Sequence, residues 1–321
     1  MGHRFGAETA KAGLWVYSSN KVSNTRTTLD TAIIDLHAAT TNSNSTLTPG
    51  WAARLAMHFE RDGQHTRLRR QPGFGPLYVQ KPFHPEPPCT HVYLIHPPGG
   101  IVGGDTLSIG ATLDTKAHSL ITTPAATKLY RADGRGAKLE QTIVVGRDAV
   151  MEWLPLETIA FDGCDFDVTT TIQLADGARV FAWEVTVFGR RAGNRPFTRG
   201  RVSQTTRIER CIDNDREPLL LERSELEGGS RRQQADWGFG AMPINATAWF
   251  APADRQLGAA LIDALGDSTP HLSITVPDRV LIIRARGNDV ETLFGELQVA
   301  WAALRPLAIG RPAALPRIWR T

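Results

Sequence analysis

The feature that most constrains the fold of this chain is a run of prolines and glycines that extends from His96 to Asp105. Pro97 and Pro98 hold φ at about −65° and lack an amide donor. The glycines of the run permit positive φ, and they are Gly99, Gly100, Gly103 and Gly104. Residues 91–95 before the run and 106–109 after it have the β-branched, aromatic and alternating residues of strands. The run therefore predicts an unusual backbone path between two strands, with Asp105 at its end.

Such a loop can hold a site, pack backbone against backbone, or bind a phosphate. The residues fit neither a Walker loop, which ends in Gly-Lys-Ser/Thr, nor the Gly-x-Gly-x-x-Gly fingerprint of dinucleotide-binding proteins. A strand rather than a helix follows the run, so no helix N-terminus is offered to a phosphate. We therefore do not expect nucleotide binding.

Composition excludes further classes of protein. The net charge is only +3 at pH 7, and the arginines are spread along the chain, so no nucleic-acid partner is expected. No apolar run approaches the ~20 residues that span a membrane, and we see no secretory signal pattern at the start of the sequence. The three cysteines, Cys89, Cys164 and Cys211, are odd in number and far apart, which favours a reducing compartment. We expect a cytoplasmic protein.

The first 48 residues differ in character from the rest. Residues 40–46 form a polar Thr/Asn/Ser tract that buries too little to offset its ordering entropy. We predict a poorly ordered N-terminal extension over residues 1–48, without chemistry of its own. Residues 49–321 are predicted to form a single β-rich domain.

The pattern from Trp51 onward predicts a mainly β fold. Short apolar or alternating segments are separated by Asp-Gly turn pairs, with no helical crossovers between them. The main expected strands are 51–58, 66–69, 77–80, 91–95, 106–109, 119–123, 139–145, 150–154, 158–161, 168–174, 179–188, 202–208, 219–226 and 280–283. Two amphipathic helices are expected near the C-terminus: one over 254–265, stopped by Gly266, and one capped by Asn288 and ended by Pro306.

Possible metal ligands gather near the proline–glycine run: His84, Cys89, His91 and His96. Strand alternation places Cys89 and His91 on one side and His96 on the other. The four side chains cannot converge from that strand alone, and a closed site would need the chain to fold back at Pro87–Pro88. Both a structural role and a transient metal contact stay open.

Three glutamates share strand faces with apolar residues, namely Glu152, Glu157 and Glu184. A carboxylate on such a face is unfavourable unless it is hydrogen-bonded, paired, metal-bound or facing internal water. Each of them can also be a solvent-facing or salt-bridged residue. No Gly-x-Ser-x-Gly or activated cysteine is present, and we do not expect an enzyme. The alternative that we retain is a β-solenoid-like carbohydrate hydrolase that uses paired carboxylates.

Several ordered motifs resemble the UreD family of urease accessory proteins, which is also called UreH. They are GPLYVQKPF at 75–83, HVYLIHPPGGIVGGD at 91–105, TTPAATKLYR at 122–131, EWLPLETIAFDG at 152–163, WE at 183–184, GR at 189–190, LRP at 304–306 and PRIW at 316–319. The resemblance covers about residues 51–321. Ala125 stands where a glycine is common in the family and Leu129 where an aromatic residue is common, and both are mild departures.

The resemblance implies a β-rich superhelical or solenoid-like body and a non-enzymatic scaffold. It implies binding to UreF, to the GTPase UreG through UreF, and to apo-urease subunits, assembled as a dimer of heterotrimers. The assembly would insert nickel into urease in a GTP-dependent way, possibly through an internal passage, with transient nickel and no tightly bound cofactor. We predict that this passage is lined or supported by five acids: Asp105, Glu152, Glu157, Asp162 and Glu184.

Overall fold

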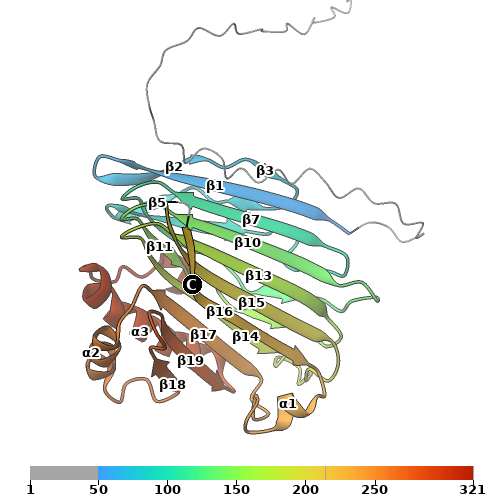
Figure 1. Cartoon of the computed structure of the whole chain (residues 1–321). Helices are drawn as coiled ribbons and strands as arrows, with labels where there is room; N and C mark the ends of the chain where they lie inside the picture. Colours follow the sequence, from blue (N-terminus) through green and yellow to red (C-terminus); the bar gives the residue numbers. More distant parts are fainter. Residues whose placement is uncertain (1–49, 214, 321) are drawn as a thin grey trace, which may run out of the picture. The chain divides into compact units, whose positions relative to one another are not determined.

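The computed structural model describes residues 50–213 and 215–320, and the predicted extension over residues 1–48 lies outside them. The described chain is mainly β, as the sequence predicts, and its strands form two large sheets (Figure 1). No helix in these two ranges is long and apolar enough to cross a bilayer.

The first sheet has eight strands. Its order is β16 (Asp215–Glu227), β15 (Arg201–Ile212), β13 (Asp165–Leu174), β10 (Ala137–Val145), β7 (Thr106–Leu113), β1 (Ala52–Asp62) and β2 (His65–Arg70), and β3 (Gly73–Phe74) pairs with β1. The strands β1, β7, β10, β13 and β15 are parallel neighbours.

The second sheet has eleven strands. Its order is β18 (Leu272–Thr275), β19 (Leu281–Gly287), β17 (Ile244–Ala251), β14 (Arg179–Phe188), β11 (Val150–Trp153), β8 (His118–Thr122), β6 (Cys89–Ile95) and β4 (Tyr78–Val79). Outside this path, β5 (Phe83–Glu86) pairs with β6, and β9 (Thr127–Leu129) and β12 (Thr158–Ala160) extend from β14.

The chain passes from one sheet to the other and back. Strands β7, β10 and β13 lie side by side in the first sheet, and the strands that follow them, β8, β11 and β14, lie side by side in the second. Each pass therefore adds one parallel strand to each sheet, which is a solenoid-like arrangement. The predicted β-rich, solenoid-like body is confirmed.

The second sheet is buried on both faces. One face, called the inner face here, packs against the first sheet through residues such as Met151, Val180 and Ala182. The opposite, outer face packs against two helices through residues such as Phe181 and Trp183. Successive residues of a strand point to opposite faces, so each position of β14 and β11 belongs to one of two different environments.

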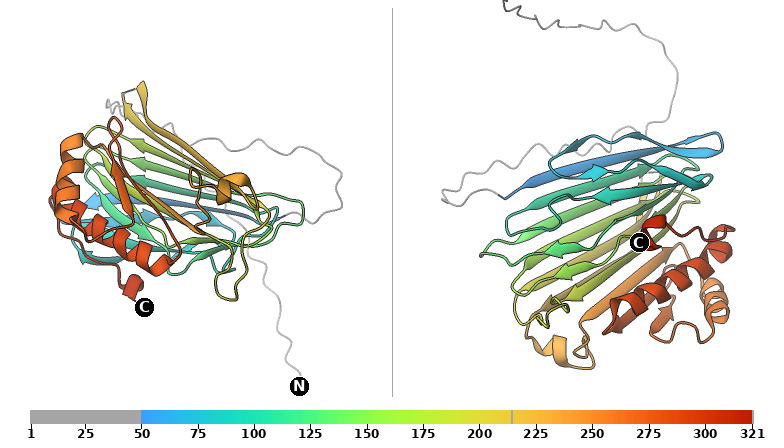
Figure 2. Two further views of the ribbon diagram at one scale, coloured as in Figure 1. Left: turned by 90° about the horizontal axis from the view of Figure 1, so that it is seen from below. Right: turned by 180° about the vertical axis from the view of Figure 1, so that it is seen from behind.

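The two helices predicted near the C-terminus are α2 (Arg255–Leu265) and α3 (Val290–Ile309), which lie together beside the second sheet (Figure 2). A single turn, α1 (Arg231–Gln234), and a 3₁₀ helix, η1 (Arg317–Arg320), complete the helical elements of the described residues. Gly266 ends α2 as predicted, with φ of 50°.

Both predicted ends of α3 were wrong. Asp289 rather than Asn288 is the N-cap, because its carboxylate accepts the amide N–H of Thr292 at 2.8 Å. Pro306 lies inside the helix, which continues to Ile309 and ends at Gly310 with φ of 65°. Glycine suits this left-handed C-terminal position, so the stop signal is Gly310 and not the proline.

Candidate functional site

A cavity of about 340 Å³ lies between the two sheets. Its walls are mostly apolar and come from inner-face residues of both sheets, for example Leu107, Ile121 and Trp153. Residues of the proline–glycine run, including His96 and Ile101, form another part of the wall. The space between the sheets is therefore an apolar cavity with a few polar groups in its wall.

Glu184 of β14 is the acidic residue in the cavity wall. Strand alternation places it on the inner face with Val180 and Ala182, so its carboxyl group points toward the first sheet. Its Oε1 accepts a hydrogen bond from the Thr170 hydroxyl at 3.1 Å, and its Oε2 accepts one from the Gln204 amide at 2.9 Å. The carboxyl group is thus held by neutral groups and not by a cation.

A second, smaller pocket continues beyond this carboxyl group. Glu184 and Gln204 line both spaces, and the small pocket of about 20 Å³ is completed by polar residues of β15, β16 and β17. Among these, Glu222 accepts hydrogen bonds from the Trp249 indole at 3.2 Å and from Arg284 at 2.5 Å. Both spaces therefore adjoin Glu184, and Glu222 is part of the wall of the smaller one.

The environment of Glu184 favours its protonated form. Burial, with a smaller contribution from the charge of Glu222, raises the pKa of Glu184 to about 7, against the opposing hydrogen bonds of Thr170 and Thr206. Its carboxyl group faces the cavity and not bulk solvent, and for this reason it is poorly solvated. A carboxyl group that titrates near neutral pH can exchange a proton for a cation.

Glu152 of β11 lies on the outer face, under α3. It is 1% exposed and accepts hydrogen bonds from His118 at 2.7 Å, Trp301 at 2.5 Å and Arg305 at 3.1 Å. Arg305 also binds Glu86 with two hydrogen bonds of 2.9 and 3.0 Å. These residues form a buried ion-pair network that joins α3 to the second sheet.

The surroundings of Glu152 lower its pKa, whereas those of Glu184 raise the pKa of Glu184. Burial alone would raise the pKa of Glu152, but the hydrogen bond and charge of His118, the charge of Arg305 and the Trp301 indole outweigh it and lower the pKa to about 2. Glu152 is consequently ionised at physiological pH and already satisfied. Its geometry suits a supporting role for the helix side of the second sheet.

Asp105 and Asp162 bind backbone amides. Asp105 is 4% exposed and accepts the N–H groups of Trp51 and Val102, each at 2.9 Å. Asp162 accepts the N–H groups of Thr198 at 2.7 Å and Arg199 at 3.0 Å. Glu157 is half-buried, and it is not among the residues of the described chain that line the cavity. The five predicted acids therefore do not gather in one place.

The proline–glycine run packs backbone against backbone beside the cavity. Ile101 donates its N–H to the carbonyl of Lys128 at 2.7 Å, and its own carbonyl accepts the N–H of Tyr130 at 2.9 Å. Gly104 has φ of 90°, and a Cβ at Gly100 would lie 2.2 Å from the Tyr130 ring. Of the uses that the sequence left open for this loop, close backbone packing is the one observed.

Loss of the Asp105 carboxylate is expected to destabilise the fold. In Asp105→Ala the amides of Trp51 and Val102 lose their acceptor, and an unsatisfied buried donor costs about 1–3 kcal/mol. We expect a free energy of unfolding lower by about 2 kcal/mol in urea denaturation. Asp105→Asn keeps one acceptor oxygen and should lose less, and equal losses in the two variants would contradict this role.

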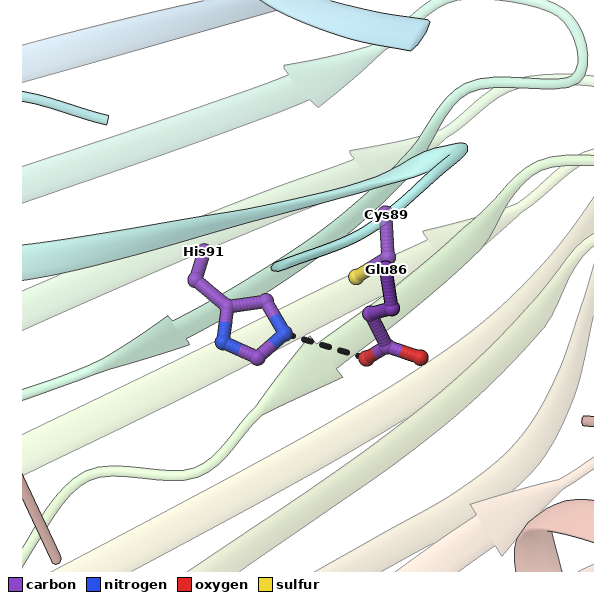
Figure 3. Close-up of side chains that lie close together, drawn as sticks. All are labelled: Glu86, Cys89 and His91. Carbon is purple, nitrogen blue, oxygen red and sulfur yellow. Dashed lines mark hydrogen bonds and ion pairs between the residues drawn. The ribbon is translucent and has the colours of Figure 1, made fainter. Parts of the chain in front are cut away.

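Of the four possible metal ligands, Cys89 and His91 lie close together, and His84 and His96 lie elsewhere. The chain does fold back at Pro87–Pro88, and this hairpin brings Glu86 to Cys89 and His91 (Figure 3). His96 instead lines the cavity, and the His84 ring lies 3.2 Å from the Thr90 hydroxyl.

The part of the chain that matches known proteins is nearly the same as the described β domain. The family model described as "UreD urease accessory protein" matches residues 52–320. The chain belongs to the UreD family of urease accessory proteins. A urease accessory protein UreD of Marinobacter nauticus is 43% identical over 283 residues, which are 84% of this chain and 93% of that protein. The corresponding protein of Citrobacter koseri is 37% identical over 89% of this chain and 97% of its own length, and UreD 2 of Brucella anthropi is 40% identical over 86% and 100%.

Membership of the UreD family confirms the predicted resemblance and supports a role in urease maturation. The geometry offers little to a two-acid hydrolase. Such an enzyme places both carboxyl groups on either side of one sugar bond. Here Glu152 and Glu184 lie on opposite faces of the second sheet.

Sequence reasoning missed the partners of both glutamates in this UreD chain. Gln204 and Thr206 share a strand face with Val202 and Ile208, so polar residues on an otherwise apolar face were a usable signal. For Glu152, the partners His118 and Arg305 are 34 and 153 residues away, and no local pattern connects them.

Proposed function

We propose that this chain is a non-catalytic, cytoplasmic scaffold in urease maturation. It binds apo-urease subunits and UreF, reaches the GTPase UreG through UreF, and takes part in GTP-dependent nickel insertion as one subunit of a dimer of heterotrimers. Support comes from its membership of the UreD family and from similarity that spans nearly the whole length of several UreD proteins.

Nickel is the cargo of this assembly, and the cavity is its proposed route. The observation that carries the proposal is that Glu184 and Gln204 line both the large cavity and the small polar pocket. A nickel ion that crosses from one space to the other meets the Glu184 carboxyl group, which exchanges its proton for the cation. Oxygen ligands hold nickel less firmly than thiolates or imidazoles do, so the ion can move on.

The other predicted acids support this route at a distance. Asp105 holds the proline–glycine loop that forms part of the cavity wall. Asp162 holds the turn at Thr198 and Arg199, and Glu152 holds α3 against the second sheet. No side-chain contact of Glu157 with the described residues assigns it a role, and its place in the passage stays a prediction.

The proposed route predicts a specific loss of nickel delivery in Glu184→Gln. The amide keeps the shape of the side chain but cannot exchange a proton for a cation. In cells that express urease with its other accessory proteins, we expect nickel per urease and urease activity to fall about tenfold, equivalent to ~1.4 kcal/mol. Glu140→Gln, an exposed glutamate of β10, is the matched control and should not change either value.

Two results distinguish the nickel passage from the role in urease maturation. Fully nickel-loaded urease with Glu184→Gln would remove the passage but leave the scaffold. Fully loaded urease in cells that lack the chain would remove the maturation role itself. Pull-down with UreF and the urease subunits tests the scaffold directly, since a carbohydrate hydrolase has no reason to bind either.

A further inference from the structure

The hairpin of β5 and β6 brings three different metal-binding groups to one place. Glu86 is paired across the hairpin with Cys89, and His91 lies two residues further along β6 on the same face as Cys89. Figure 3 shows the three side chains directed toward one another. One carboxylate oxygen, the Cys89 sulfur and a His91 ring nitrogen all lie within 4.8 Å of one another.

We propose that this hairpin holds one divalent cation of the nickel–zinc class through Glu86, Cys89 and His91. This site lies on the outer face of the second sheet, and the cavity lies on the inner side. The inference is independent of the proposed nickel route.

The separation of two of the three donors is close to that in a tetrahedral site. Metal–ligand distances of about 2.0–2.1 Å to nitrogen and oxygen place two such ligands about 3.3 Å apart. The observed separation of His91 Nε2 and Glu86 Oε1 is 3.0 Å. The cation takes the place of the hydrogen between these two atoms, with His91 then carrying its proton on Nδ1, after the atoms separate by a few tenths of an ångström and the Cys89 side chain rotates inward.

A mixed set of sulfur, nitrogen and oxygen ligands selects borderline cations over Mg²⁺ and Ca²⁺, which prefer oxygen alone. The Cys89 sulfur also lies within 4.8 Å of donor atoms on His118 and Glu152, which are hydrogen-bonded to each other. Arg305 binds both carboxylate oxygens of Glu86, with Nη2 2.9 Å from Oε1 and Nη1 3.0 Å from Oε2, and so fixes the orientation of this carboxylate.

The charge of the cluster favours a cation. The formal charges of Glu86, Glu152 and Arg305 sum to −1 in a buried region. A divalent cation that binds with release of the Cys89 thiol proton brings the sum to zero.

The cation reaches the site from the Glu86 end of the hairpin. The Glu86 side chain is 10% exposed, whereas His91 is 1% exposed.

Titration of the metal-stripped full-length chain with Co²⁺ tests this proposal, because a cobalt–thiolate bond gives a charge-transfer absorption that no other ligand here produces. We expect the band to grow to one equivalent and to disappear when Zn²⁺ is added. Cys89→Ser should abolish it, and Cys164→Ser, which removes another buried cysteine, should leave it unchanged. His91→Ala should weaken Zn²⁺ binding by at least about tenfold.

The wild-type protein alone can overturn the proposal, whatever the folding of the variants. Absence of the thiolate band in wild type would exclude the site. A band that survives His91→Ala but is lost in His118→Ala would also overturn it, because the cation would then occupy the other side of Cys89. None of these results depends on urease, so failure here leaves the proposed function untouched.

Discussion

Arg305→Ala is expected to lower the free energy of unfolding by about 3–5 kcal/mol, because it removes one partner of a buried ion pair. Arg305 is 3% exposed and binds both Glu86 and Glu152. Without the guanidinium group, two carboxylates face each other in a region that excludes water. The variant also loses the contact of the guanidinium with the Trp301 ring, at 5.1 Å from its centroid.

Urea denaturation in the presence of a chelator, monitored by tryptophan fluorescence, measures this loss. Arg279→Ala is the matched control, since Arg279 pairs with Glu217 on the surface and such a pair contributes about 0–1 kcal/mol. Glu86→Gln combined with Arg305→Met should recover part of the stability by removing charge from both partners. A loss in Arg305→Ala no larger than in Arg279→Ala would show that the network does not hold α3.

The β fold could be predicted from the sequence because its signals are local. The strand predicted over residues 179–188 is observed as Arg179–Phe188, and Asp-Gly turns separate its neighbours. Strand alternation and turn residues act over a few positions, so one sequence is enough to read them. The family resemblance implied a superhelical or solenoid-like body, but neither it nor any pattern of spacing predicted two sheets of successive parallel strands.

The roles of the acids could not be predicted in the same way. Glu152 and Glu184 both lie between apolar residues in the sequence. In a sheet with one solvated face, the apolar residues of a strand mark the face that is buried. Here both faces of the second sheet are buried, so alternation does not separate them. The outer face is covered by α3, which comes more than a hundred residues later, and Trp301 and Arg305 on it decide the environment of Glu152.

The contacts made by the hairpin at Pro87–Pro88 could also be predicted only in part. The need for a fold-back was recognised, and Cys89 and His91 were placed correctly on one side of a strand. The register of the return strand was not readable, because β5 is short and irregular and a shift of one residue would turn its side chains to the other face. The third group brought to Cys89 is therefore Glu86 and not His84.

Glu184→Gln is expected to stabilise the protein at alkaline pH, although it impairs nickel delivery. The pKa of Glu184 is about 7 in the folded chain, against 4.5 as its ordinary value. Between these values the folded state binds more protons than the unfolded state. The stability due to this group is therefore complete below about pH 4.5 and is lost as the pH rises through about 7, by up to about 3 kcal/mol in all.

Glutamine does not titrate, so Glu184→Gln escapes this loss. Glu222, which is paired with Arg284, is the charged neighbour that disfavours the ionised form of Glu184, and Thr170 and Gln204 are neutral. Relative to wild type, we expect the free energy of unfolding of the variant to increase by up to about 3 kcal/mol between about pH 5 and pH 8.5. Urea denaturation at the two pH values measures the change, and Glu140→Gln should follow wild type. Parallel pH profiles for Glu184→Gln and wild type would show that the carboxyl group is ordinarily solvated. Greater stability together with reduced urease activation would instead mark Glu184 as a residue that serves the route and not the fold.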